Sequence, residues 1–241
     1  MGYGFQETDL KIDKRDKTEG GLENEGEVCF RGRNNFIGYL NNEQATRETL
    51  DADGYIHSGD LGTKDSEGFV KITGRIKELI ITAGGENVAP VLIEDSLKTI
   101  CPIISNVMVV GDDRKFLTAI ITLKVDVDNS QGMNTPTHNL TEVVKRFLKD
   151  ELKITDVNTT EEAATHKELL KYLQKKVNDN NELQISRAQY IRRFKLIPDD
   201  FSMEGEELTP TLKLKRKVVH QKYKDIIEEM YLDEELPPAK I

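Results

Sequence analysis

Short apolar runs alternate with turn-forming residues along the first third of the chain. The runs carry Val, Ile, Phe, Tyr and Thr, and Gly, Asp and Ser separate them, which is typical of short strands joined by turns. One helical pattern interrupts them, over Asn42 to Leu50. The predicted strands are Asp9 to Ile12, Glu27 to Arg31, Tyr55 to His57, Phe69 to Thr73 and Leu79 to Thr82. This region is therefore predicted to be mostly β-sheet.

The rest of the chain mixes helical and strand patterns. Ala89 to Ile100 is a helical pattern whose second residue is a proline, which suits a first helical turn. The next two apolar runs, Val107 to Val110 and Leu117 to Val125, are joined through Gly111 to Arg114 and predict a β-hairpin. The polar stretch over residues 129–138 predicts a loop or an insertion.

Three amphipathic helices and one further strand follow. The first helix is capped near Thr141, the second covers Thr160 to Val177, and the third covers Arg216 to Tyr231. The asparagine-rich stretch 178–181 is expected to end the second helix. Between the second and third helices, Ala188 to Ile197 has the pattern of a strand.

The predominant element type changes near residues 75–78. We therefore predict a boundary there, with one domain over residues 1–75 and a second over residues 76–241. The chain as a whole is predicted to be of the α+β class.

The composition excludes several functions. Charged residues make up 32% of the chain, with a net charge of −9, and acids and bases are interspersed, which argues against nucleic acid as a partner. Cys29 and Cys101 belong to no C-x-x-C pair, and the four histidines show no ligand spacing, so no metal site is predicted. The free cysteines fit a reducing, cytoplasmic compartment. No apolar run approaches the roughly 18 residues that span a bilayer, which leaves only peripheral membrane contact open.

Candidate chemistry concentrates in three consecutive segments, Tyr55 to Gly62, Thr73 to Glu78 and Ile80 to Pro90. In the first, Asp60 is a carboxylate in a turn flanked by glycines. It can accept hydrogen bonds from neighbouring hydroxyl groups, such as those of a ribose. Taken alone, it can equally be an Asx turn.

Together these segments resemble the adenylate-forming superfamily, which includes acyl-CoA synthetases, luciferases and peptide-synthetase adenylation domains. Ile76 to Val88 and Glu207 to Arg216 look most like long-chain acyl-CoA synthetases, in particular the bubblegum-like branch. The resemblance extends over nearly the whole chain. It implies the β-rich end of a large AMP-binding domain, with a β-barrel-like subdomain, hinged to a small, mobile C-terminal domain of antiparallel sheet packed with helices.

The resemblance implies roles for three residues near the predicted boundary. Asp60 would hold the ribose hydroxyls of ATP or AMP, and Arg75 would bind the nucleotide near its ribose and α-phosphate. An ion pair of Arg75 with Glu78 is the alternative. Lys77 matches the hinge on which the small domain of the family rotates.

Two further segments match the family's motifs. Lys213 matches the lysine that stabilises developing charge during adenylate formation, although Leu212 stands where many relatives have glycine and Lys215 is a second candidate. The loop residues Gly84, Gly85, Glu86 and Asn87 match the surface along which the CoA thiol arrives. A tight turn that needs glycine is the other reading of this loop.

The superfamily also needs a phosphate-binding loop and a pocket for the acyl chain, and neither is found in this sequence. The chain is therefore expected to be the C-terminal part of a ligase that uses fatty acid, ATP and CoA, with Mg²⁺ held mainly by a missing N-terminal domain, in cis or as a separate chain. Alone it is expected to be inactive. The alternatives are a non-catalytic homologue that serves as a structural or binding subunit, and a ligase for another carboxylic acid.

Overall fold

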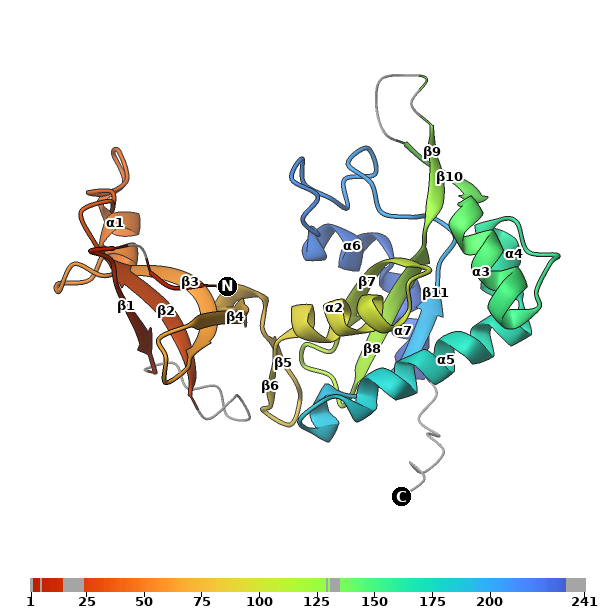
Figure 1. Ribbon diagram of the computed structural model, residues 1–241, viewed down its shortest axis with the longest axis horizontal. Helices are drawn as coiled ribbons and strands as arrows, with labels where there is room; N and C mark the ends of the chain where they lie inside the picture. The colour runs from red at the N-terminus through yellow and green to blue at the C-terminus, as the bar shows by residue number, and fades with distance from the viewer. Residues whose placement is uncertain (1, 5, 15–23, 129, 131–134, 233–241) are drawn as a thin grey trace. The chain divides into compact units, whose positions relative to one another are not determined.

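The computed structural model describes residues 2–4, 6–14, 24–128, 130 and 135–232 (Figure 1). Its contacts divide the chain into two compact units, Met1–Leu92 and Ile93–Ile241, and each is described by itself. The division falls within helix α2 (Pro90–Ile100). The boundary at residues 75–76 stays a prediction.

The N-terminal unit is built on a four-stranded antiparallel sheet. Its strands follow one another in the order β1 (Asp9–Asp13), β2 (Glu25–Arg31), β3 (Ile56–Lys64) and β4 (Val70–Arg75). Helix α1 (Glu43–Thr49) precedes β3, and the Asn42 side chain caps it by accepting a hydrogen bond from the Ala45 amide at 3.0 Å. The short helix predicted here is therefore confirmed.

After β4 the chain forms three very short elements. A 3₁₀ turn, η1 (Ile76–Glu78), leads into a hairpin of β5 (Ile80–Ile81) and β6 (Asn87–Val88), and α2 follows.

The second unit centres on a three-stranded sheet in the order β11-β8-β7. Strands β7 (Ile104–Val110) and β8 (Leu117–Leu123) form the predicted antiparallel hairpin, and β11 (Ile191–Leu196) joins β8 as a parallel strand. Every residue of β8 is buried, because helices cover both faces of the sheet. Figure 1 shows α2 and α5 (Lys167–Glu182) on the face opposite α7 (Lys224–Leu232). The α+β class is confirmed.

One apolar cluster joins the sheet to the C-terminal helices. It consists of Met108, Val110, Ile120, Ile197, Phe201, Leu208, Val219, Tyr223, Ile227 and Met230. Because it takes residues from β7, β8, the segment after β11 and both helices α6 (Arg216–Lys222) and α7, it fixes these two helices against the sheet.

Several element boundaries differ from the sequence predictions. The long second helix is two helices, α4 (Thr160–Thr165) and α5, because His166 ends one and its Nδ1 caps the other by accepting from the Leu169 amide at 3.3 Å. The stretch 178–181 continues α5 and does not end it. There Asn180 is fully buried and its amide donates to the Ile93 carbonyl at 3.4 Å, a tertiary bond that overrides its low helix propensity.

Two more predictions are corrected. The final helix breaks at Tyr223 into α6 and α7. Part of the predicted loop 129–138 is strand β10 (Thr135–Leu140), which pairs with β9 (Val125–Asp128); residues 129 and 131–134 lie outside the described part. Helix α3 (Glu142–Leu152) follows, capped at Thr141 as predicted.

Among the described residues, no helix is both long and apolar enough to cross a bilayer.

Candidate functional site

Asp60 and Arg75 lie directly opposite each other on the adjacent strands β3 and β4. Arg75 Nε is 3.1 Å from Asp60 Oδ1, and the two side chains are 50% and 30% exposed respectively. A carboxylate and a guanidinium thus stand side by side at an accessible surface. Together they can offer an acceptor for hydroxyl groups and a donor fork for a phosphate.

Asp60 lies in a strand and not in a turn, which corrects the local interpretation from the sequence. Strand β3 bulges at this point: three residues, Ser58 to Asp60, stand opposite the single residue Val28 of β2. Gly59 has a φ of +72°, a left-handed conformation that favours glycine. The bulge re-aims the Asp60 side chain, and this explains the need for glycine next to it.

Two side chains hold the bulge in place. Ser58 Oγ donates to the Val28 carbonyl at 2.6 Å and accepts from the Asp60 amide at 3.0 Å. Glu27 is 7% exposed, and its Oε1 accepts from the Gly59 amide at 2.8 Å. These bonds satisfy backbone groups that the irregular ladder leaves unpaired. Glu27 and Ser58 were not among the site residues predicted from the sequence.

Glu27 also bonds to His57, which adjoins a buried thiol. Glu27 Oε2 is 2.5 Å from His57 Nδ1, and Cys29 Sγ is 3.5 Å from the same nitrogen. Burial, and next the nearby Glu27 carboxylate, raise the pKa of the Cys29 thiol to about 12.

Lys77 is exposed in the 3₁₀ turn η1, directly after the strand that carries Arg75. Its neighbour Glu78 is half-buried. Arg75 forms an ion pair with Asp60 on the neighbouring strand, and this pair does not involve Glu78.

The glycine loop between β5 and β6 is a tight turn organised by Thr82. The Thr82 carbonyl accepts a hydrogen bond from the Gly85 amide at 2.8 Å, and the Thr82 side-chain Oγ1 accepts one from the Glu86 amide at 3.2 Å. Gly85 has a φ of +80°, a left-handed conformation that favours glycine. Gly84 is under no such constraint, because a Cβ there would meet only Thr82 Oγ1, at an ordinary contact distance of 3.7 Å.

Lys213 is exposed on a compact turn in the second unit. The Thr209 amide donates to the Lys213 carbonyl at 2.8 Å, and the Lys213 amide donates to Thr209 Oγ1 at 3.0 Å. Leu212 has a φ of +58°, the conformation that glycine adopts most easily. The turn thus fixes the backbone of Lys213 and leaves its side chain at the surface.

A buried ion pair attaches this turn to the body of the unit. Arg216, at the start of α6, donates through Nη1 and Nη2 to the two oxygens of Glu94 at 2.7 and 2.6 Å. Glu94 is 5% exposed and also accepts from the Val109 amide at 2.7 Å. Arg216, the first residue of the last predicted helix, is therefore one half of a charge-assisted clamp between α2, β7 and α6.

The predicted site residues accordingly fall into two sets. Asp60, Arg75, Lys77 and the loop 84–87 belong to the unit Met1–Leu92, and Lys213 belongs to the unit Ile93–Ile241.

Comparisons with known proteins show which families the chain resembles. Residues 77–151 match the family model described as the AMP-binding enzyme C-terminal domain. Among solved structures, the A domain of a carboxylic acid reductase from Segniliparus rugosus, in complex with AMP and a co-purified carboxylic acid, has a similar fold. Its TM-score is 0.65 at 20% sequence identity, over 94% of this chain and 31% of that chain.

The similar curated sequences are ligases. The chain is 48% identical, over 88% of its length, to the long-chain-fatty-acid–CoA ligase ACSBG2 of Gallus gallus, and 44% identical, over 87%, to ACSBG1 of Bos taurus. It spans 28% of the length of each. The family-model match and the curated relatives place the chain with the C-terminal part of the adenylate-forming enzymes. Within that superfamily, it belongs with the long-chain-fatty-acid–CoA ligases of the bubblegum-like branch.

Proposed function

We propose that this chain is part of an ATP-dependent ligase that joins a long-chain fatty acid to CoA through an acyl adenylate. The first step forms the adenylate and releases pyrophosphate, and in the second the CoA thiol attacks it and displaces AMP. The observation that carries the proposal is the accessible cross-strand pair of Asp60 and Arg75, held on a bulge that Glu27 and Ser58 brace.

In this proposal Asp60 accepts hydrogen bonds from the ribose hydroxyls of ATP or AMP, and Arg75 donates to the ribose and the α-phosphate. The two side chains suit these tasks, since one is an acceptor and the other is a fixed cation with several donors. Mg²⁺ on the pyrophosphate would be held mainly outside this chain.

Lys213 is the proposed catalytic residue of the adenylation step, in which its ammonium group stabilises the charge that develops between the carboxylate and the α-phosphate. Its exposure supports this role over Lys215, which is half-buried and whose amide donates to the Glu207 carbonyl at 2.7 Å at the start of α6. The clamp between Glu94 and Arg216 keeps the turn of Lys213 in position.

Gly84, Gly85, Glu86 and Asn87 are proposed to line the path of the CoA thiol in the second step. Gly84 supports this role, because its backbone does not require a glycine. Rotation of the region 76–241 about Lys77 would bring Lys213 and then this loop to the same adenylate. We place the boundary with the large domain, residues 1–75, at this lysine.

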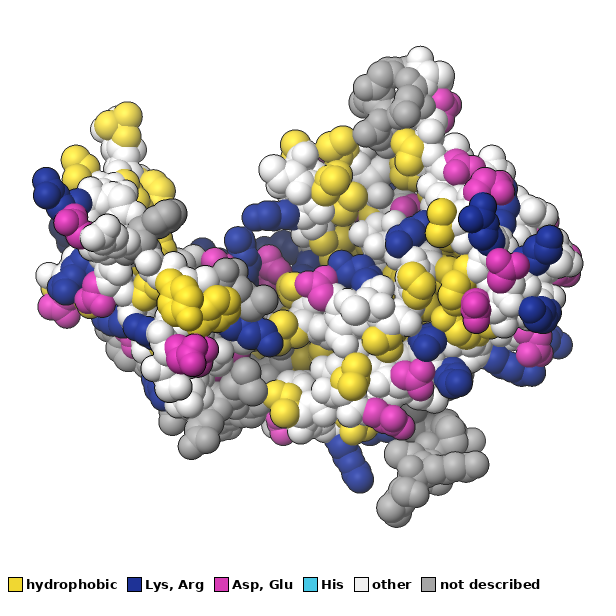
Figure 2. Space-filling model, viewed as in Figure 1, with side chains coloured by type: hydrophobic (Ala, Val, Ile, Leu, Met, Phe, Trp, Pro, Cys, Tyr) yellow, Lys and Arg dark blue, Asp and Glu magenta, His cyan; other side chains and the backbone are white. Residues whose placement is uncertain are grey.

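An apolar loop supports the existence of a further, larger partner domain. Ile37 and Leu40 are 95% and 92% exposed, and the rings of Phe36 and Tyr39 lie 5.0 Å apart beside them. Figure 2 shows apolar side chains exposed at the surface of the N-terminal unit. We propose that the remainder of the large domain covers this loop, either in cis or as a separate chain. Cytoplasmic location and peripheral membrane contact stay predictions.

The test starts from the native polypeptide, identified in its source cells through peptides of this chain, and from its recombinant form. We expect a mass more than twice the 27.4 kDa of this chain, and ligase activity with long-chain fatty acids that the 241 residues alone lack. Lys213→Ala should reduce adenylate formation about 100-fold or more, as expected when a main electrostatic contact is removed. The same variant should still convert a supplied acyl adenylate to acyl-CoA. Lys215→Ala is the matched control.

Two results would replace the proposal. A native polypeptide of the size of this chain, without activity in the presence of its partners, would indicate a structural or binding subunit. A preference for aryl or amino acids would retain the superfamily chemistry and change the substrate. For the loop, Gly84→Ala should slow the second step and spare the first, and an equal effect on both would exclude a specific role in CoA delivery.

A further inference from the structure

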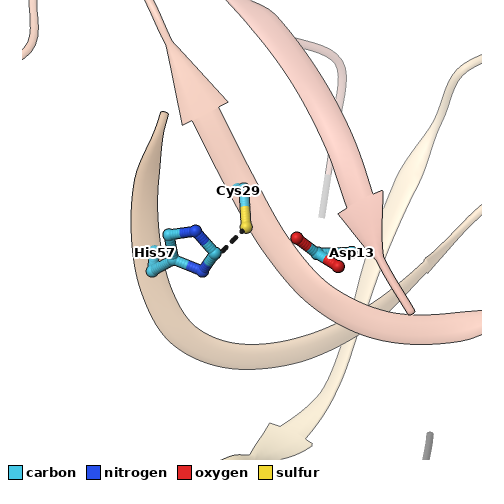
Figure 3. A group of neighbouring side chains, drawn as sticks. All are labelled: Asp13, Cys29 and His57. Carbon is cyan, nitrogen blue, oxygen red and sulfur yellow. Dashed lines mark hydrogen bonds between the residues drawn. The ribbon is translucent and has the colours of Figure 1, made fainter. Parts of the chain in front are cut away.

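A mixed group of potential metal ligands lies on the sheet of the N-terminal unit. Asp13 ends β1, Cys29 lies in β2 and His57 lies in β3, and one ligand atom of each is within 4.8 Å of the other two (Figure 3). The Cys29 side chain is fully buried, whereas those of Asp13 and His57 are 11% and 18% exposed. No metal site was predicted from the sequence, because these residues are far apart along the chain.

The spacing of the sulfur and nitrogen atoms suits a tetrahedral transition metal. Cys29 Sγ and His57 Nδ1 are 3.5 Å apart. Tetrahedral angles and the usual Zn–S and Zn–N bond lengths separate two such ligands by about 3.5 Å. Cys29 and His57 therefore need little rearrangement to share one ion.

Two more carboxylates complete the surroundings. Glu27 Oε2 is 2.5 Å from His57 Nδ1, a hydrogen-bond contact. It can supply a fourth ligand once the ion replaces the shared proton and the two atoms move to about 3.3 Å apart, the separation of tetrahedral ligands. Asp51 Oδ2 is 3.5 Å from His57 Nε2, the position of the acceptor that usually orients a metal-bound imidazole. Lys11 also lies close, 3.8 Å from Asp13 and 3.4 Å from Asp51.

We propose that Asp13, Cys29 and His57 bind Zn²⁺, with Glu27 as the fourth ligand. A thiolate and an imidazole select a borderline ion such as Zn²⁺ over Mg²⁺ or Ca²⁺. On binding, the Cys29 thiol gives its proton to the solvent and its sulfur binds the metal, with no change of oxidation state.

The site would reinforce the bulge that carries Asp60. Glu27 would bind the ion through Oε2 while its Oε1 still accepts from the Gly59 amide. The ion would thereby join β1, β2 and β3 next to the bulge, because His57 directly precedes Ser58. The inference concerns this sheet alone and does not depend on the proposed ligase activity.

The test is a titration of the purified 241-residue chain with Co²⁺, a spectroscopic substitute for Zn²⁺. We expect one Co²⁺ per chain, with the visible bands of tetrahedral cobalt, a thiolate charge-transfer band in the near ultraviolet, and loss of both when Zn²⁺ is added. Cys29→Ser should abolish the charge-transfer band. Cys101→Ser, which removes the other buried cysteine, in the second unit, should leave it unchanged.

Three results would contradict the proposed metal site. The wild-type chain could lack the thiolate charge-transfer band, the band could survive Cys29→Ser, or it could disappear with Cys101→Ser. If circular dichroism shows that Cys29→Ser does not fold, Asp13→Asn, which keeps the thiol, is the second test variant. It should raise the Co²⁺ concentration at half-saturation by about tenfold or more, and an unchanged midpoint would also count against the site.

Discussion

The guanidinium of Arg216 donates hydrogen bonds to both carboxylate oxygens of Glu94, a residue that is 5% exposed. Arg216 follows Lys213 by three residues, and Glu94 belongs to α2. The pair therefore ties the turn of the proposed catalytic lysine to the helix after the glycine loop, within the second unit.

Arg216→Ala is expected to destabilise the second unit by about 3 kcal/mol or more, because it leaves a buried carboxylate without its counter-charge. Arg216→Lys should recover only part of this loss, since an ammonium group cannot form the two-pronged contact. Urea denaturation followed by far-UV circular dichroism measures both. The exposed neighbour Lys217→Ala is the control, and an equal effect of Arg216→Ala and Lys217→Ala would contradict the clamp.

Ser58→Ala is expected to cost the N-terminal unit about 1 kcal/mol, because the Asp60 amide and the Val28 carbonyl each lose a partner. The bulge should also loosen, which hydrogen exchange at the Asp60 amide would detect. Ser66→Ala, in the exposed turn before β4, is the matched control and should change neither quantity. Unaltered exchange at Asp60 in the Ser58 variant would mean that the hydroxyl does not brace the bulge.

Asp60 and Arg75 should be weakly coupled in the ligand-free chain. Their side chains are 30% and 50% exposed, and ion pairs at such surfaces contribute below about 1 kcal/mol. A double-mutant cycle with Asp60→Asn and Arg75→Gln, followed by urea denaturation, measures the coupling. It should shrink further as NaCl is added, because salt screens exposed charges. A coupling well above this range would assign the pair a structural role in place of ligand binding.

Leu212→Gly is expected to stabilise the chain by up to about 1 kcal/mol, because it removes the strain of a leucine at a φ of +58°. The leucine side chain is 69% exposed, so little packing is lost. Thr211→Gly is the control. Thr211 has no left-handed backbone, and glycine there should destabilise the chain. If Leu212→Gly lowers the urea midpoint as much as Thr211→Gly does, the leucine side chain has a role of its own.

Local patterns predicted much of this molecule. The four strands that form the first sheet, the capped helix α1 and the β7–β8 hairpin were all recognisable, because each depends on side chains close together in sequence. Helix lengths were less predictable. His166 and Tyr223 interrupt continuous apolar stripes, and Asn180 prolongs a helix through a bond to Ile93, which is distant along the chain.

The α+β class and the superfamily could be predicted from the sequence, since the patterns behind both are continuous runs of residues. Tertiary structure alone decided which side chains meet. The strand register sets Arg75 opposite Asp60, α2 brings Glu94 to Arg216, and three neighbouring strands bring Asp13, Cys29 and His57 together. These contacts depend on register and packing between distant segments, which one-dimensional spacing does not encode.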